Sequence, residues 1–430
     1  MSKSVLIAGT GPVAIQLAVL FDQYSDNQIA MASRSLQSEK SRKFIEAYQQ
    51  TQKVEVSVQN EAHQQLAGEA TLANVYESYH DIQKQYDVLV LACTADAYSE
   101  VLSQISERVL TQLKSVVLIS PTFGSHMIVK QQLQAYQPNI EVISFSTYLG
   151  DTGVTDVDQP HRVITKGLKK RLYIGSTQSN TQTFQEMVAL MTQIGVPVTV
   201  VEHPLQAESR NSSLYVHPAL FMNMHALKAV FQGTDVPFFV YKLFPEGPIT
   251  MKCITEMRLM WQEVMHILQK MNIETLNLLK FMVKENYPLR EETIDASKIE
   301  AFETLSPVEQ EYLLYVRYTG ILIDPFSKPD AAGKYFDFSA VPFKHVFQNG
   351  SGEWQIPRMP SEDYYRTQIM RGIARVLKIN TPMMDTFMYR YEAQLEAFQA
   401  NHPNDSFSAQ FKVQDFAHDI ACIESQLSPH

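Results

Sequence analysis

The chain has 430 residues, a formal net charge of −10 at pH 7 and an apolar fraction of 45%. This length predicts two or three domains with substantial cores, and the negative charge argues against non-specific nucleic-acid binding. The three cysteines, Cys93, Cys253 and Cys422, lack C-x-x-C spacing, which favours a reducing cytoplasm and no structural zinc. The absence of a run of about 18 apolar residues argues against a membrane span.

The first 34 residues have the pattern strand, glycine turn, helix, strand. An apolar run at residues 5–8 leads directly into Gly-Thr-Gly-Pro-Val-Ala at 9–14, and a helical pattern follows at 15–21. This context predicts a dinucleotide-binding turn, with the pyrophosphate on the helix N-terminus. The residues of the turn expected to contact the cofactor are Gly9, Thr10, Gly11, Pro12 and Val13.

The second strand, at residues 28–33, ends in Ser33-Arg34 and not in an acidic residue. An acid here would bind a ribose 2′-hydroxyl and repel a 2′-phosphate. Arg34, with Lys40, Arg42 and Lys43 just downstream, suits a 2′-phosphate, so we expect NADPH over NADH. The alternative is that these basic side chains are only solvated surface residues.

Strand-like runs alternate with helical segments up to about residue 205. Apolar runs at 86–93, 116–121 and 140–145 predict buried parallel strands with helices on both faces, an α/β doubly wound sheet of the Rossmann type. Two further runs, at 171–174 and 198–201, flank a helical segment at 183–194 and extend the same sheet. We therefore assign residues 1–205 to an NADP(H)-binding domain.

Residues 206–430 read as a second, mainly helical domain for substrate binding and dimerisation. Apolar residues at helical spacing predict helices at 251–271, 273–283, 309–323 and 363–377. Residues 324–355 are rich in Pro, Gly, Asp and aromatics, which predicts a long ordered loop or a small hairpin.

Ligands of open α/β sheets bind beyond the carboxyl ends of the strands. The segments that follow the strands at 86–93 and 140–145 are therefore candidate contact regions. The residues placed there are Thr94, Ala95 and Asp96, for the cofactor, and Tyr148 and Asp151, for the substrate. Ordinary loop chemistry is the alternative for each of them.

A nicotinamide enzyme needs no protein nucleophile, but it does need proton transfer. His217, in Arg-Asn-Ser-Ser-Leu-Tyr-Val-His-Pro at 210–218, is the best candidate acid/base, although a structural histidine is the commoner case. Pro218 disfavours helix at His217, so we expect an extended or turning backbone there. Arg210 is a candidate clamp for a carboxylate, and Tyr241 is a candidate hydrogen-bond donor or a packing residue.

Two further patterns limit the chemistry. The histidines show no metal-ligand spacing, so we expect no metal site. The chain also has no Lys followed three or four residues later by Asn, the pair used by ketopantoate reductases and β-hydroxyacid dehydrogenases. This weakens, without excluding, a simple ketone-reductase reading.

Six motifs in order resemble the opine-metallophore dehydrogenases over nearly the whole chain. They lie at residues 9–18, 92–98, 144–151, 210–218, 241–250 and 359–366. The resemblance implies an NADPH-dependent reduction of the Schiff base formed by an α-keto acid and a primary amine. That amine belongs to a nicotianamine-like intermediate built from D-histidine and an aminobutyrate unit, and the product is a metal chelator.

The resemblance also implies site residues and assembly. It assigns Arg34 and Lys40 to the 2′-phosphate, places Asp151, His217 and Tyr241 in the substrate cleft as catalytic residues, and implies a cytoplasmic homodimer. Similarity to the staphylopine branch of the family favours pyruvate over 2-oxoglutarate. The alternatives are another NADP-dependent keto- or hydroxyacid reductase and a non-catalytic NADP(H) sensor.

Overall fold

The structure, a computed structural model, describes residues 2–286, 289, 292–320, 331–333 and 339–427. The chain forms two compact units: unit 1 comprises residues 1–211 and 421–430, and unit 2 comprises residues 212–420. The functional assignment of the two predicted domains, 1–205 for cofactor and 206–430 for substrate, stays a prediction. Among the described residues, no helix is both long and apolar enough to cross a membrane.

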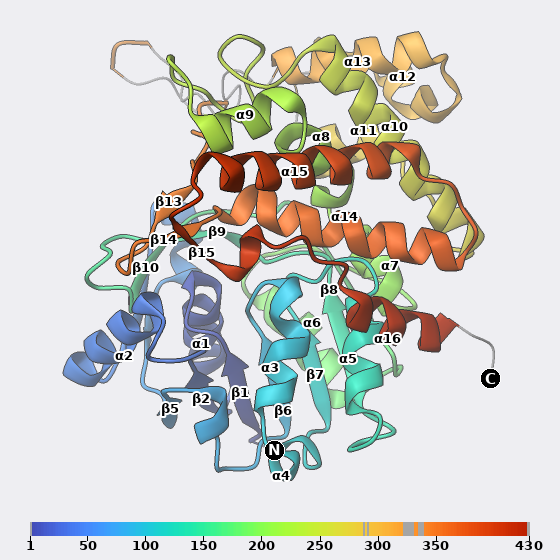
Figure 1. The fold of residues 1–430 in the computed structure, drawn as a ribbon. Helices are drawn as coiled ribbons and strands as arrows, with labels where there is room; N and C mark the ends of the chain where they lie inside the picture. The colour runs from blue at the N-terminus through green and yellow to red at the C-terminus, as the bar shows by residue number, and fades with distance from the viewer. Residues whose placement is uncertain (1, 287–288, 290–291, 321–330, 334–338, 428–430) are drawn as a thin grey trace. The chain divides into compact units, whose positions relative to one another are not determined.

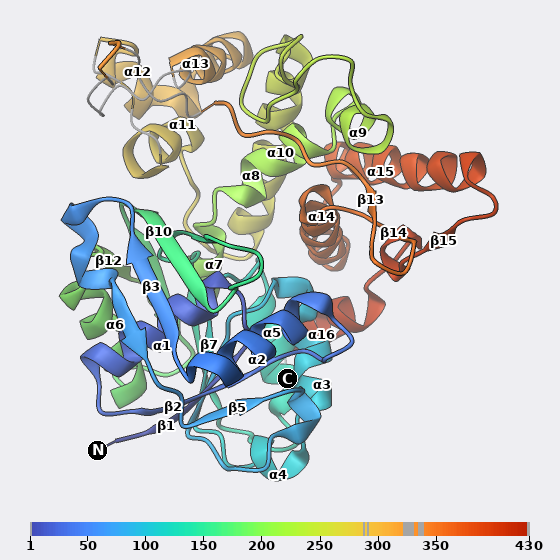
Figure 2. The same ribbon diagram turned by 90° about the vertical axis from the view of Figure 1, so that its left-hand side faces the viewer.

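Unit 1 contains an eight-stranded sheet in the order β12-β11-β8-β7-β6-β1-β2-β5 (Figures 1 and 2). Six neighbouring strands, from β8 to β5, are parallel, and β11 is antiparallel to β8. The predicted α/β class and the extension of the sheet by the two later strands are confirmed, although β11 reverses direction. The strands are β1 (Ser4–Ala8), β2 (Gln28–Ala32), β5 (Asn74–Tyr76), β6 (Val88–Leu91), β7 (Ser115–Leu118), β8 (Glu141–Phe145), β11 (Leu172–Ser176) and β12 (Val198–Val200).

Helices cover both faces of this sheet, as its fully buried strands require. Helices α1 and α6 contact each other, and α3 contacts α5 on the opposite face (Figure 2). The helices of unit 1 are α1 (Pro12–Tyr24), α2 (Glu39–Thr51), α3 (Tyr98–Gln104), α4 (Glu107–Leu110), α5 (Ser125–Leu133), α6 (Gln182–Gln193) and α7 (Pro204–Ser209), with short 3₁₀ turns η1 (Glu61–Leu66), η2 (Tyr79–Asp81) and η3 (Ala95–Ala97).

A second sheet of four strands, β4-β3-β10-β9, packs against α1. Its strands are β3 (Val54–Val58), β4 (Gly68–Ala70), β9 (Gly150–Val154) and β10 (Arg162–Leu168). This sheet was not predicted, because its strands are partly exposed and β4, β9 and β10 contain glycine, and such segments carry little periodic signal.

Unit 2 is mainly helical, as predicted. The patterns at 251–271 and 363–377 correspond to α10 and α14, and the pattern at 309–323 corresponds to α13, with residues 321–323 outside the described residues. The expected helix at 273–283 was only partly right, since it is the short α11 and a π-helical turn, η4. The helical elements are α8 (Ser213–Phe221), α9 (Met224–Gln232), α10 (Met251–Lys270), α11 (Leu278–Lys280), η4 (Phe281–Asn286), α12 (Ala296–Ala301), η5 (Phe302–Thr304), α13 (Pro307–Gly320), α14 (Arg358–Val376), α15 (Pro382–Asn401), η6 (Ala409–Phe411) and α16 (Ala417–Leu427), the last of which runs into unit 1.

The segment 324–355 contains a small hairpin. Strands β13 (Phe347–Gln348) and β14 (Glu353–Gln355) pair antiparallel, and β15 (Ser406–Phe407) adds to β14 in parallel. The hairpin alternative is therefore confirmed for residues 347–355, while 324–330 and 334–338 lie outside the described residues.

Candidate active site

The glycine turn joins β1 to α1 at the carboxyl edge of the large sheet. Gly9 has φ +128°, and a Cβ there would lie 3.1 Å from the carbonyl oxygen of Ala92, so the protein's own packing requires glycine. At Gly11, in contrast, a Cβ would meet open space. Packing within the protein therefore does not require glycine at position 11. The open space beside Gly11 is suited to the close approach of a ligand.

The N-terminus of α1 is equally open. Gly11 is its N-cap, Pro12 occupies the first turn, and this turn carries no acidic residue. Within the described part of the chain, no side chain accepts a hydrogen bond from the N–H groups of Val13 or Ala14. Unsatisfied N–H groups and the positive end of the helix dipole form a site for an anion such as a pyrophosphate.

A neighbouring helix N-terminus on the same edge is already occupied by the protein. The carboxylate of Glu208, which is fully buried, accepts hydrogen bonds from the backbone N–H groups of Gly124 and His126 at the start of α5, at 2.8 and 2.9 Å. It also accepts from Ser144 Oγ at 2.8 Å, and its Oε2 lies 3.0 Å from His126 Nδ1. Since α5 is filled by Glu208, the open α1 terminus is the better anion site of the two.

The chain after β2 has the predicted basic character. Ser33 is buried, with Oγ donating to the carbonyl of Glu77, whereas Arg34 is exposed. Arg34 Nη2 donates to both carboxylate oxygens of Glu100, on α3, at 3.0 and 3.1 Å. Lys40 is exposed in the first turn of α2. Arg34 therefore meets a carboxylate partner that the sequence did not indicate.

The segment after β6 lies next to the glycine turn, as the close approach of Ala92 to Gly9 shows. Thr94 precedes the 3₁₀ turn η3, whose first residues are Ala95, which is buried, and Asp96, which is exposed. Burial raises the pKa of the Cys93 thiol to about 12, so this group stays a protonated thiol near neutral pH.

The backbone at His217 differs from the prediction. His217 lies inside α8, and Pro218 is accommodated within the same helix. Pro218 lacks the N–H that would bond four residues back, at a cost of about 3 kcal/mol in a helix interior. Helix α8 packs against α10 and α14, and this packing offsets the loss. The expectation of an extended or turning backbone was wrong because tertiary burial overrides the local preference of proline.

His217 belongs to a buried ionic cluster in unit 2. Its Nδ1 lies 3.3 Å from Oδ1 of Asp363, whose side chain is fully buried on α14. Arg366 donates from Nη1 to the same Oδ1 and from Nη2 to Glu362 Oε1 at 2.9 Å. The other ring nitrogen, Nε2, lies 3.4 Å from Ser213 Oγ. Nη1 of Arg366 also lies 3.4 Å from Nδ1. Because Asp363 and Arg366 both face Nδ1, Nε2 is the candidate ring atom for proton transfer.

The remaining predicted residues are divided between the two units. Asp151 is the second residue of β9 and does not lie in a loop. It is exposed, and no partner of its carboxylate is found among the described residues. Tyr148 is half-buried, with Lys169 Nζ 5.1 Å from its ring centre. Arg210 is 9% exposed at the end of α7. These three belong to unit 1, whereas His217 and Tyr241, a half-buried turn residue, belong to unit 2.

Sequence reasoning missed Asp363, Arg366, Glu208 and Glu100. The first two lie within the motif at 359–366, so that motif was the available signal for them. Glu208 lies two residues before Arg210 but carries no pattern of its own. Within the described residues, no group of three or more His, Cys, Asp or Glu side chains is arranged to hold a metal ion.

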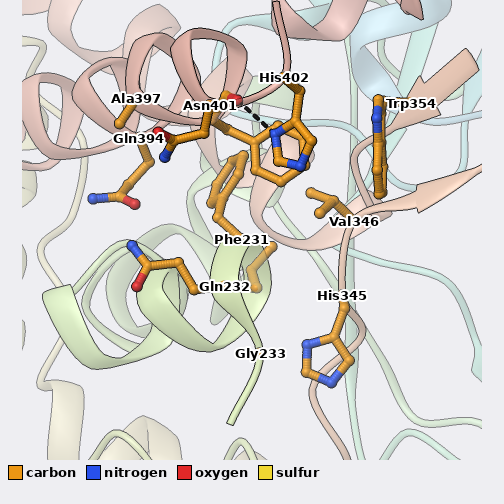
Figure 3. Close-up of a pocket in the computed structure, with 12 residues that line it drawn as sticks. Phe231, Gln232, Gly233, His345, Val346, Trp354, Gln394, Ala397, Asn401 and His402 are labelled. Atoms are coloured by element: carbon orange, nitrogen blue, oxygen red, sulfur yellow. Dashed lines mark hydrogen bonds between the residues drawn. The ribbon is translucent and has the colours of Figure 1, made fainter. Parts of the chain in front are cut away.

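Unit 2 also contains a pocket of about 440 Å³ between α9, α15 and the β13–β14 hairpin (Figure 3). Its wall includes Phe231, Trp354 and Phe398, and His402 Nδ1 lies 2.8 Å from the carbonyl oxygen of Phe398. None of the residues predicted for cofactor, substrate or catalysis line it. It is therefore distinct from the candidate catalytic cluster around His217.

The structure combines an α/β unit, with a glycine turn between its first strand and first helix, and a helical unit that carries a His–Asp pair. Residues 3–427 match the family model described as staphylopine dehydrogenase. The chain belongs to this family and is an opine dehydrogenase.

Relatives match from end to end. Staphylopine synthase of Staphylococcus aureus (strain Mu50 / ATCC 700699) is 55% identical over 423 residues, which cover 98% of each chain. Pseudopaline synthase of Pseudomonas aeruginosa (strain UCBPP-PA14) is 33% identical and covers 92% of this chain and 90% of its own. A solved structure of yersinopine dehydrogenase with NADP⁺ bound has a TM-score of 0.91 at 29% identity, covering 99% of this chain and 98% of that one.

Proposed function

We propose that the chain is an NADPH-dependent opine dehydrogenase that forms a metallophore of the staphylopine type. Its substrates are an α-keto acid, pyruvate, and the primary amine of an intermediate built from D-histidine and an aminobutyrate unit. The observation that carries the proposal is the match to staphylopine synthase over 98% of both chains. That match runs through the glycine turn of unit 1 and the His217 cluster of unit 2.

The residues present fit a nicotinamide dinucleotide. The open space at Gly11 and the uncapped N-terminus of α1 suit the pyrophosphate, and Arg34 and Lys40 suit the 2′-phosphate. Gly9, Thr10, Pro12, Val13, Thr94, Ala95 and Asp96 complete the proposed cofactor site. When bound, NADPH supplies the hydride that reduces the carbon–nitrogen double bond.

The protein's own contribution is proton transfer and orientation. Imine formation requires an unprotonated amine, and the carbonyl oxygen leaves as water. His217 is proposed to remove the amine proton through Nε2 and to return a proton to the departing hydroxyl group. Asp363 orients the imidazole from the opposite nitrogen. Asp151 and Tyr241 are proposed to assist, and Arg210 and Tyr148 to bind the substrate.

The identity of the keto acid is tested by product mass. Purified protein is incubated with NADPH, the amine and either pyruvate or 2-oxoglutarate. We expect turnover and the mass of the reduced condensation product with pyruvate. Preferred turnover with 2-oxoglutarate would contradict the staphylopine assignment while leaving the reaction type intact.

The family resemblance also leads us to propose a cytoplasmic homodimer. Light scattering on the purified chain tests the assembly, because a monomer has a mass of 49.0 kDa. A mass of twice that value supports the dimer, and the monomer mass contradicts it.

A further inference from the structure

The ion pair between Arg34 and Glu100 joins two elements that flank the glycine turn. Arg34 follows β2, and Glu100 lies in the first turn of α3, which follows β6. Because β1 lies between β6 and β2 in the sheet, the pair spans the carboxyl end of the strand that leads into the turn. The pair therefore lies at the edge where the adenosine end of a dinucleotide binds in such folds.

The pair is exposed and well formed. Arg34 and Glu100 retain 66% and 47% of their side-chain exposure, and Arg34 Nη2 contacts both carboxylate oxygens at 3.0 and 3.1 Å. Gln104 donates a third hydrogen bond to Glu100 Oε1 at 3.1 Å, which holds the carboxylate toward Arg34. Exposed pairs of this kind contribute little to stability, so the fold does not depend on the pairing of Arg34 with Glu100.

A 2′-phosphate bound at Arg34 would disturb the ion pair between Arg34 and Glu100. The phosphate is an acceptor for the same guanidinium N–H groups, so it must compete with Glu100 for them. It also brings negative charge close to a carboxylate, which is unfavourable. A cofactor with a ribose 2′-hydroxyl meets neither penalty, since it brings no charge and a carboxylate accepts its hydrogen bond.

We propose that Glu100 is a specificity-determining residue that competes with the 2′-phosphate for Arg34 and so weakens NADP(H) binding. This inference rests on the proposed function. Glu100 lowers the affinity of the protein for NADP(H) and so reduces the preference of the protein for NADP(H) over NAD(H). Weaker binding of the oxidised cofactor favours its release after each turnover.

The test is cofactor binding by calorimetry on the full-length protein without keto acid or amine. Glu100→Gln keeps the shape of the side chain and removes the charge. We expect the Kd for NADP⁺ to fall about fivefold, the size of one exposed ionic interaction, with the Kd for NAD⁺ unchanged. The matched control is Glu107→Gln in α4, an exposed acid without an ionic partner among the described residues, and it leaves both values unchanged.

A second background tests the route through Arg34. In Arg34→Ala, the further change Glu100→Gln should tighten NADP⁺ binding less than it does in the wild type, because the competition for the guanidinium is gone and only the repulsion between carboxylate and phosphate is relieved. An unchanged or higher Kd for NADP⁺ in the single variant Glu100→Gln would overturn the proposal. The proposal would also be overturned if Glu100→Gln lowered the Kd by the same factor in the Arg34→Ala background as in the wild type. Wild-type protein that binds no NADP⁺ would instead contradict the proposed function.

Discussion

Nδ1 of His217, on α8, lies 3.3 Å from Oδ1 of Asp363, on α14. The carboxylate is fully buried, and its Oδ2 has no hydrogen-bond partner among the described residues. A buried carboxylate that fixes one imidazole nitrogen leaves the other nitrogen correctly oriented for proton transfer, which is the arrangement a general acid/base needs.

Asp363→Asn is expected to lower kcat by a factor of about 10² to 10⁴, the usual contribution of an oriented acid/base. His217→Ala should lower kcat similarly, while both variants bind NADP⁺ like the wild type. The pH dependence of kcat distinguishes a role of Asp363 in orienting His217 from a role in stabilising the fold. Only the loss of the acid/base changes the shape of the pH profile of kcat. Asp385→Asn, an exposed acid paired with Arg371, is the control; normal kcat in Asp363→Asn would remove this residue from the mechanism.

Arg34→Ala is expected to raise KM for NADPH by about ten- to a hundredfold, because a charge-assisted pair to the 2′-phosphate is lost. KM for NADH should change little. Steady-state kinetics with both cofactors make the comparison, and Lys53→Ala, which breaks an exposed pair with Glu69, is the control. Equal effects on both cofactors would contradict the assignment of Arg34.

Glu208→Gln is expected to lower the free energy of unfolding by about 2–4 kcal/mol. The carboxylate accepts from the backbone N–H groups of Gly124 and His126 through different oxygens, and the amide keeps only one oxygen, so one of the two N–H groups loses its acceptor and faces an NH₂ group. Urea denaturation measures the change, with exposed Glu202→Gln as the control. Wild-type stability in the variant would show that the four contacts of Glu208 are not needed to hold α5 and α7.

His161 is expected to make unit 1 sensitive to acid. It is 4% exposed, neither ring nitrogen has a hydrogen-bond partner within the described residues, and burial lowers its pKa below the ordinary value of 6.5. The unfolded chain therefore binds a proton before the folded chain does as the pH falls. Its contribution to stability is present above pH 6.5 and is lost as the pH falls from 6.5 through the lowered value.

His161→Leu should therefore reduce the loss of Tm between pH 7.5 and 5.5, because the variant has no imidazole to protonate at this position in the unfolded chain. Calorimetric scans at the two pH values measure this difference, and exposed His80→Gln is the control. An unchanged pH dependence in His161→Leu would show that another group governs the acid sensitivity.

The strands of the large sheet other than β5 were predictable from sequence, because they are continuous apolar runs and the glycine turn has a characteristic pattern. Gly9 illustrates this, since its positive φ suits the tight turn between strand and helix. The edge strand β5 was missed, since it has three half-buried residues. The four-stranded sheet was not predictable, because its strands are only partly buried and β3 pairs with β10, far along the chain.

The catalytic cluster shows a different limit. His217 was selected because it is a titratable residue close to the predicted boundary between the two domains. Arg366 is 149 residues away in the sequence, and only the packing of α8 against α14 brings the two side chains together. Local rules also gave the wrong backbone at Pro218, because they cannot include the burial of α8 between its neighbours. The likeness of the 359–366 motif to a known family was the one indication that this segment mattered.

The central claim is that the chain condenses a keto acid with an amine at the expense of NADPH. The most direct test follows NADPH absorbance with pyruvate alone, with the amine alone and with both together. The account predicts oxidation only with both substrates and a product with the mass of the reduced adduct. Oxidation with the keto acid alone would identify a ketone reductase, and binding of NADPH without oxidation under any of these conditions would identify a sensor; either result would contradict the account.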